Sequence, residues 1–180
     1  QGFTVVAPNV RGSVGYGKKY HHLDDVEKRL DSVHDVACLV EHLIQTGVAR
    51  PESIAVMGAS YGGYMTLASI TNYPKLWAAA IDTVGMSDLE TFLENTAEYR
   101  RAHRESEYGS LARDRETLRR VSPIHKVDQI EAPLMVIHGA NDPRVPVSEA
   151  DQIVASLEKR GVAVKYLRYP DEGHGLTKLK

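Results

Sequence analysis

Short apolar runs alternate with helical patterns along this chain of 180 residues, and this alternation constrains its fold more than any other feature. Near-continuous apolar runs are typical of strands buried on both faces, and their alternation with helices is typical of a parallel sheet. We therefore expect an α/β fold of three layers, with a mostly parallel sheet between helices. The expected strands are residues 3–7, 54–57, 77–81, 134–137 and 162–169.

Three stretches have the apolar spacing of amphipathic helices: residues 31–46, 64–71 and 148–160. Cys38 lies in the first of them, and we expect it to be buried as a small apolar side chain. Residues 88–121 differ, because they are rich in Arg and Glu and poor in large apolar residues. We expect this stretch to be a solvated helical excursion beside the sheet.

Composition and charge exclude several classes of protein. The formal net charge of −2 at pH 7 argues against a general nucleic-acid or anionic-membrane binder. No run approaches the roughly 18 apolar residues of a membrane span, and no signal peptide is recognisable. The single cysteine cannot form an internal disulfide, which suits a reducing compartment. We therefore expect a cytoplasmic protein without nucleic-acid or membrane partners.

Residues 58–62, Gly-Ala-Ser-Tyr-Gly, have the form G-x-S-x-G and lie between an expected strand and an expected helix. In that context the serine sits on a sharp turn, where glycines let the neighbouring backbone pass closely. Ser60 is therefore a candidate nucleophile, and the backbone N–H of Tyr61 can donate to an oxyanion. Taken alone, the pentapeptide also fits a purely structural turn.

A serine nucleophile needs a base and a carboxylate that orients the base, and both follow in the chain order Ser, Asp, His. Asp142 follows the expected strand 134–137, and His174 follows the strand 162–169. Sites in open α/β folds gather at these carboxyl ends of parallel strands. Taken singly, Asp142 also fits a cap for the helix that begins nearby, and His174 also fits a surface histidine. Their order and shared position favour a triad with Ser60.

Other polar clusters are weaker candidates for chemistry. Residues 21–25 contain two His and two Asp, but adjacent histidines point in different directions and no second ligand pair follows, so we interpret these residues as a solvated loop. The glycine-rich turn at 12–17 lacks the Gly-Lys-Ser/Thr ending of a phosphate loop. We interpret His138 as structural and the arginine pairs at 100–101 and 119–120 as charged helical surface. We expect no metal and no cofactor.

Four ordered motifs carry a resemblance that spans nearly the whole chain. They are Asn-Val-Arg-Gly-Ser-Val-Gly-Tyr-Gly at 9–17, Gly-Ala-Ser-Tyr-Gly-Gly-Tyr at 58–64, His-Gly-Ala-Asn-Asp-Pro-Arg-Val-Pro at 138–146 and Asp-Glu-Gly-His at 171–174. Together they resemble the catalytic domain of the prolyl oligopeptidase family, which includes dipeptidyl and acylaminoacyl peptidases. The resemblance implies an α/β-hydrolase fold and a serine peptidase that cleaves short peptides through an acyl-enzyme.

The resemblance also implies roles for particular residues. Ser60 would attack the peptide carbonyl, His174 would pass its proton to the leaving amine, and Asp142 would hold the imidazole. Arg144 matches a position where prolyl oligopeptidase uses arginine to hold a substrate carbonyl. Val145, like Tyr61, matches a position that lines the pocket for the residue before the cut.

The chain also departs from the family pattern. We expect residues 1–180 to be a partial α/β-hydrolase domain, without the family's β-propeller, its first strands, its final helix or the tyrosine that usually supplies a second oxyanion donor. Loss of one oxyanion donor typically lowers turnover by ~100- to 1,000-fold. An unpaired sheet edge invites pairing with another chain. We therefore expect low activity from this piece and a tendency to form homo-oligomers.

Two other functions stay open at this stage. A carboxylesterase, a thioesterase or a dienelactone-hydrolase-like enzyme would share the fold and the triad. A non-catalytic binding module on the same fold is the second alternative, because fold does not dictate function.

Overall fold

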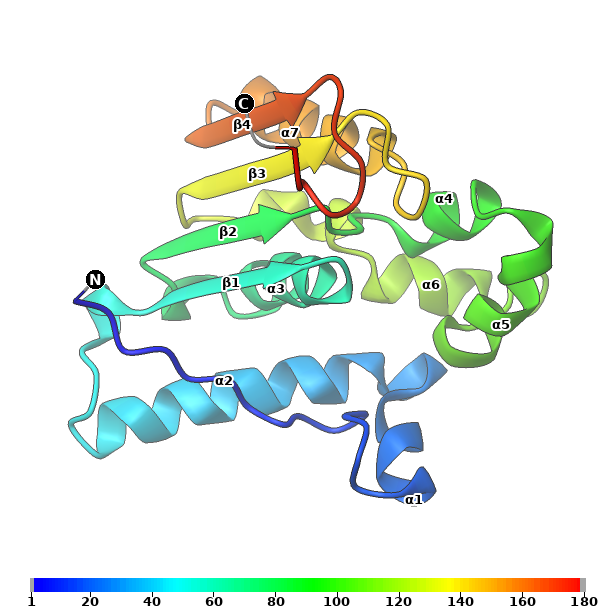
Figure 1. Ribbon diagram of the computed structural model, residues 1–180. Helices are drawn as coiled ribbons and strands as arrows, with labels where there is room; N and C mark the ends of the chain where they lie inside the picture. The colour runs from blue at the N-terminus through cyan, green and yellow to red at the C-terminus, as the bar shows by residue number, and fades with distance from the viewer. Residues whose placement is uncertain (1, 179–180) are drawn as a thin grey trace.

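The computed structural model describes residues 2–178, and its centre is a parallel sheet of four strands in the order β1-β2-β3-β4 (Figure 1). The strands are β1 (Ala55–Ala59), β2 (Ala79–Thr83), β3 (Leu134–Gly139) and β4 (Val164–Tyr169). The parallel α/β fold is therefore confirmed, and four of the five expected strands are present. Sequential strands are neighbours throughout, so all four carboxyl ends meet at one edge of the sheet.

Helices connect the strands, and those expected over residues 31–46, 64–71 and 148–160 are all present. The α-helices are α1 (Lys18–His21), α2 (Arg29–Gln45), α3 (Tyr61–Asn72), α4 (Leu89–Glu94), α5 (Glu98–Tyr108), α6 (Arg115–Val121) and α7 (Ser148–Lys159). Short 3₁₀ helices lie at His22–Asp24, Val26–Lys28, Pro51–Ser53, Pro74–Leu76 and Pro123–Gln129.

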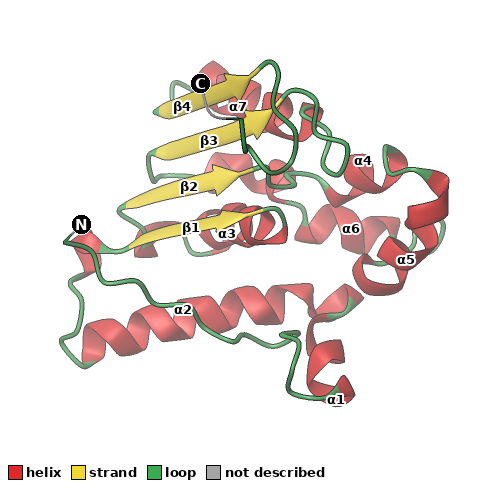
Figure 2. Ribbon diagram, viewed as in Figure 1, coloured by secondary structure: helices red, strands yellow, loops and turns green. Residues whose placement is uncertain are grey.

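The helices that contact the sheet most extensively pack on one of its faces. Helices α3 and α7 meet the side of the strands that carries Ala80, Leu134 and Val136, and the three side chains are at most 2% exposed. Figure 2 shows both helices behind the strands. Met57, on the opposite face, is 73% exposed. We expected a second helical layer over that face. No such layer is present within residues 2–178.

A second apolar core lies beyond the sheet, under the segment that we expected to be a solvated excursion. Buried side chains of α4 and α6, including Phe92 and Leu118, pack with Tyr64 of α3 and Tyr108 of α5. The prediction that residues 88–121 are helical is correct, but the prediction that they are merely solvated is wrong. Their few apolar residues are spaced so that they pack together and against Tyr64 of α3.

The prediction of a strand at residues 3–7 is wrong, because these residues form no strand. Phe3 is 88% exposed and Val5 is 85% exposed, and Figure 1 draws the segment as an irregular trace outside the sheet. An apolar, β-branched run becomes a strand only where a neighbouring strand accepts its hydrogen bonds. No other strand pairs with these residues in the described part of the chain.

Cys38 is exposed, so the prediction that it is buried is also wrong. The buried face of α2 is formed by Val33, Ala37 and Val40. Cys38 is about 100° around the helix from Ala37, and its Sγ lies 3.4 Å from Nε2 of the exposed His34.

Candidate active site

Ser60 lies on a strained turn between β1 and α3. Its backbone has φ 58° and ψ −117°, a left-handed φ that residues with a side chain rarely adopt. The backbone N–H of Ser60 donates to the carbonyl of Thr83, at the end of β2, over 2.9 Å. A Cβ on Gly58 would lie 2.2 Å from the carbonyl oxygen of Gly62, so this turn closes only with glycine at position 58. The turn points the Ser60 side chain out from the edge of the sheet.

The structure brings Ser60, Asp142 and His174 together in one hydrogen-bonded series. His174 Nε2 lies 3.0 Å from Ser60 Oγ, and His174 Nδ1 lies 2.7 Å from Asp142 Oδ2. The three residues follow β1, β3 and β4, and residues separated by more than a hundred positions therefore meet at the carboxyl edge of the sheet. This arrangement can withdraw a proton from a hydroxyl group and stabilise the positive charge that forms on the imidazole.

The carboxylate of Asp142 is fully buried, yet it is held in its charged form. Burial acts to raise the pKa of Asp142, but hydrogen bonds from His138, from the backbone N–H groups of Val145 and Arg144, and from His174 lower the pKa to about 2. The N-terminus of α7 has no side-chain cap, so Asp142 orders its own loop and does not cap that helix.

His138 lies directly behind Asp142 and is fully buried. Its Nε2 is 3.0 Å from the carbonyl oxygen of Val145 and 3.5 Å from Asp142 Oδ2. A carbonyl oxygen only accepts hydrogen bonds, so His138 Nε2 carries a proton. His138 therefore ties the loop after β3 to the end of that strand, as a structural residue does.

Asp82 is a buried carboxylate that our sequence analysis did not single out. It lies on β2 and is 0% exposed, and its Oδ1 fills the space beside Gly63 and Gly85. Burial raises the pKa of Asp82 to about 7, although His138 and a backbone contact from Gly85 act in the opposite direction. The one available signal was an aspartate within the apolar run Ala79–Thr83.

Replacing Asp82 by Asn is expected to make the protein relatively more stable as the pH rises. The folded pKa of Asp82, about 7, lies above its ordinary value of 3.8. The wild type therefore loses stability as pH rises from about 4 to 7, by at most about 4 kcal/mol, and Asn does not titrate. Urea unfolding at several pH values measures this, with exposed Glu131→Gln as the control. A stability difference that is the same at pH 5 and pH 8 would contradict the assignment.

The side chain of Tyr61 faces a buried charge cluster and not the hydroxyl of Ser60. Its hydroxyl accepts a hydrogen bond from Arg29 Nη1 over 2.7 Å and donates to Asp24 Oδ2 over 2.9 Å. Arg29 is fully buried and also donates to Asp24 over 2.7 Å and to the carbonyl of Glu107 over 2.7 Å. This cluster fixes the first turn of α3 against α2 and α5.

The cluster around Arg29 was not predicted from the sequence, and the interpretation of residues 21–25 as a solvated loop is wrong for Asp24. Asp24 is only 6% exposed, and a Cβ on Gly12 would lie 2.0 Å from its Oδ1. Gly12, at the start of the glycine-rich turn at 12–17, therefore packs on Asp24. Arg29 also lies 5.3 Å from the ring centroid of Tyr61 and 4.9 Å from that of Tyr108.

Replacing Asp24 by Ala is expected to lower the free energy of unfolding by about 3 kcal/mol, because it leaves the Arg29 guanidinium buried without its closest carboxylate. The neighbouring Asp25→Ala is the matched control. Asp25 pairs with the half-exposed His22, and such surface pairs contribute about 1 kcal/mol or less. Urea unfolding of both variants provides the measurement. Equal losses from the two variants would contradict this account of Asp24.

Arg144 and Val145 follow Asp142 in the same loop but have different surroundings. Arg144 is exposed, whereas Val145 is 2% exposed and packs in the core beside α4 and α6. The backbone N–H groups of both donate to Asp142 Oδ1, over 2.8 and 3.0 Å. Both residues therefore shape the loop that holds the Asp142 carboxylate.

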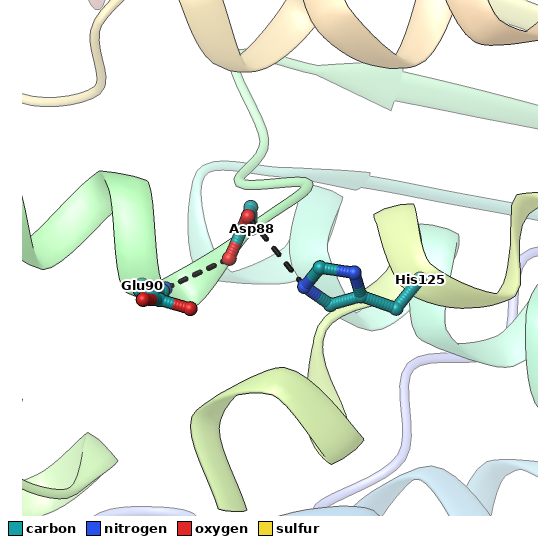
Figure 3. A group of neighbouring side chains, drawn as sticks. All are labelled: Asp88, Glu90 and His125. Carbon is teal, nitrogen blue, oxygen red and sulfur yellow. Dashed lines mark hydrogen bonds and ion pairs between the residues drawn. The ribbon is translucent and has the colours of Figure 1, made fainter. Parts of the chain in front are cut away.

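Another polar cluster, separate from the series of Ser60, His174 and Asp142, consists of Asp88, Glu90 and His125 (Figure 3). His125 Nε2 is 3.7 Å from Asp88 Oδ2, and Asp88 Oδ1 accepts a hydrogen bond from the backbone N–H of Glu90 over 2.9 Å. The Glu90 carboxylate is already paired with Arg119 over 2.7 Å and with Arg115. These residues stabilise the packing of α4 on α6, and we assign them no chemistry.

Within residues 2–178, no helix combines the length and the apolar character that crossing a membrane requires.

Comparisons with known proteins agree on one family. The model of the Prolyl oligopeptidase family matches residues 1–180. Dipeptidyl peptidase family member 6 of Caenorhabditis elegans is 39% identical over 184 residues, which cover 99% of this chain and 25% of that protein. Dipeptidyl aminopeptidase BIII of Pseudoxanthomonas mexicana is 36% identical over 183 residues, covering 99% of this chain and 27% of that protein.

A solved structure is similar as well. A puromycin-hydrolysing peptidase of Mycobacterium tuberculosis aligns with a TM-score of 0.87 and 30% identity, covering 93% of this chain and 25% of that one. The chain thus spans about a quarter of the length of the relatives that it matches.

Proposed function

Because the chain belongs to the prolyl oligopeptidase family, we propose that it forms the catalytic part of a serine peptidase that hydrolyses short peptides through an acyl-enzyme. The observation that carries the proposal is the series of hydrogen bonds from Ser60 through His174 to Asp142. The strained turn at Ser60, at the carboxyl edge of a parallel sheet, is its second support.

The protonation states follow from the surroundings of Asp142. Its pKa is lowered to about 2, so near neutral pH it is a carboxylate and can only accept hydrogen bonds. His174 Nδ1 must then carry a proton, which leaves Nε2 free to accept the proton of Ser60. His174 is therefore the general base in the first step.

Acylation begins when Ser60 Oγ attacks the substrate carbonyl and its proton passes to His174 Nε2. Asp142 stabilises the imidazolium, which then gives the proton to the leaving amine as the peptide bond breaks. Water attacks the resulting ester in the same way, with His174 again as base, and releases the acid and free Ser60. The series needs no cofactor for either step.

We assign the oxyanion contact to the backbone N–H of Tyr61. Tyr61 is the first residue of α3, and the first N–H groups of a helix have no acceptor within it. The positive end of the helix dipole lies at the same place. The side chain of Tyr61 serves this contact indirectly, because its bonds to Asp24 and Arg29 fix the start of α3.

Amide and ester substrates that share one acyl group test the proposal. A peptidase hydrolyses the peptide amide, and the Ser60→Ala variant does not. Hydrolysis of the ester alone would identify an esterase instead. Binding of peptides without any cleavage, unchanged by Ser60→Ala, would favour a non-catalytic module.

We also propose that copies of this chain associate through a free sheet edge, as expected from the sequence. Strands β1 and β4 are the two outer strands of the described sheet, and an unpaired edge is a template for another strand. Light scattering across protein concentrations tests this.

A cytoplasmic location stays a prediction that rests on the single cysteine.

A further inference from the structure

Three arginine side chains line one small hollow beside the loop of Asp142. The hollow has a volume of about 40 Å³ and lies between residues 143–146 and the start of α5, where Arg100, Arg104 and Arg144 border it. Figure 1 shows the yellow loop after β3 reaching toward the green region of α4 and α5. No Asp or Glu is among the residues that line this hollow.

These three arginines differ from most others in the described part of the chain. Arg11, Arg29, Arg50, Arg115, Arg119 and Arg168 each pair with a carboxylate. Within residues 2–178, Arg100, Arg104 and Arg144 form no such ion pair. Arg100 and Arg104 are four residues apart on α5, where two like charges repel and destabilise a helix. An anion between them would remove this repulsion.

The position of the hollow connects it with the proposed reaction. Arg144 donates from its backbone N–H to Asp142 Oδ1 over 2.8 Å, so one wall of the hollow is two residues from the proposed triad. Arg104 lies over the ring of Phe92, 5.7 Å from its centroid, which limits the directions that its guanidinium can take. A substrate group held here would lie beside the carboxyl edge of the sheet.

Size and charge define the group that fits. Guanidinium groups bind carboxylates through paired, parallel hydrogen bonds. A volume of about 40 Å³ is about three times the roughly 10–15 Å³ that one water molecule needs on the same measure, so the hollow admits a carboxylate. We propose that this hollow binds a carboxylate of the peptide substrate, and that the enzyme prefers peptides with an acidic side chain or a free C-terminus near the cleaved bond.

The inference rests on the proposed peptidase function, and matched substrates separate the two. We would measure kcat/KM for peptide substrates that carry either Glu or Gln at each of the two positions before the cut. We would also compare a short peptide whose C-terminus is free with the same peptide amidated. At least one carboxylate substrate is expected to be cleaved about tenfold faster than its neutral partner, as one charged hydrogen bond provides. The pair that shows the preference identifies the source of the carboxylate. The preference is expected to fall in about 0.5 M salt.

The double variant R100Q/R104Q is expected to bring the ratio of carboxylate to neutral substrate to within about twofold of one. The double variant R113Q/R120Q removes the same number of charges from exposed positions outside the hollow and should keep the wild-type ratio. Because each ratio is measured within one variant, a general loss of stability does not change it.

Three results would overturn the inference. If the wild type cleaves neutral peptides through Ser60 but shows no preference in any pair, or if R100Q/R104Q keeps the preference, the hollow binds no substrate carboxylate and the peptidase function stands. If no peptide is cleaved and Ser60 does not react with a fluorophosphonate, both proposals fail together.

Discussion

Replacing Asp142 by Asn is expected to lower kcat for peptide hydrolysis by about 10⁴-fold while the protein remains folded. The amide can donate to His174 where the carboxylate only accepts, so the imidazole takes the wrong tautomer and cannot accept the proton of Ser60. Ser60→Ala and His174→Ala are expected to lower kcat by about 10⁶-fold. Steady-state kinetics on one peptide amide, with thermal unfolding of each variant, provide the measurement.

The exposed Asp128→Asn is the matched control for this series and should leave kcat within about twofold of the wild type, since surface substitutions change little. The effects of Ser60, His174 and Asp142 should not add, because the three residues act as one unit. An Asp142→Asn enzyme that keeps a tenth or more of the wild-type kcat would show that the series of hydrogen bonds is not the catalytic device.

Replacing Gly58 by Ala is expected to disrupt the turn at Ser60 and to abolish activity. The added Cβ would lie 2.2 Å from the carbonyl oxygen of Gly62 and 2.4 Å from its carbon, and both are backbone atoms that cannot rotate away. Overpacking of this kind typically costs about 1–3 kcal/mol, and here the displacement falls on the nucleophile itself. Far-UV circular dichroism and urea unfolding measure the loss of stability, and the rate of Ser60 labelling by a fluorophosphonate measures the loss of geometry.

Gly62→Ala provides the control from the same motif. A Cβ at Gly62 meets nothing within 4 Å, and Gly62 lies inside α3, where Ala is the better helix former. This variant is expected to fold at least as stably as the wild type. If the two variants behave alike, the close approach of Gly58 to Gly62 is not what holds the turn.

The contrast between these glycines shows what the motif predicted and what it did not. The pattern G-x-S-x-G predicted the turn and the position of Ser60, because a serine between a strand and a helix has few other arrangements. It treated the glycines as equivalent. Of the three glycines in residues 58–64, Gly58 and Gly63 approach other atoms closely, whereas a side chain at Gly62 would meet nothing within 4 Å. The distinction depends on contacts across the turn, and a one-dimensional pattern does not contain them.

Local patterns predicted the sheet and the residues of the candidate site, whereas long-range pairs escaped them. Asp142 and His174 each follow an apolar strand, so the shared edge of a parallel sheet brings them together. Arg29 meets the Glu107 carbonyl across 78 positions, and its burial depends on partners from separate segments. The prediction of a strand at residues 3–7 failed for a related reason. A strand forms only beside a neighbouring strand, and the sequence of the run itself does not specify that neighbour.

The measurement that tests the central claim most directly is the intact mass of the protein after exposure to a fluorophosphonate, for the wild type, Ser60→Ala and His174→Ala. The assembled series from Ser60 through His174 to Asp142 predicts one adduct per wild-type chain, none on Ser60→Ala, and labelling of His174→Ala slowed by several orders of magnitude. A folded wild type that takes up no adduct, or one that labels equally fast without His174, would contradict it.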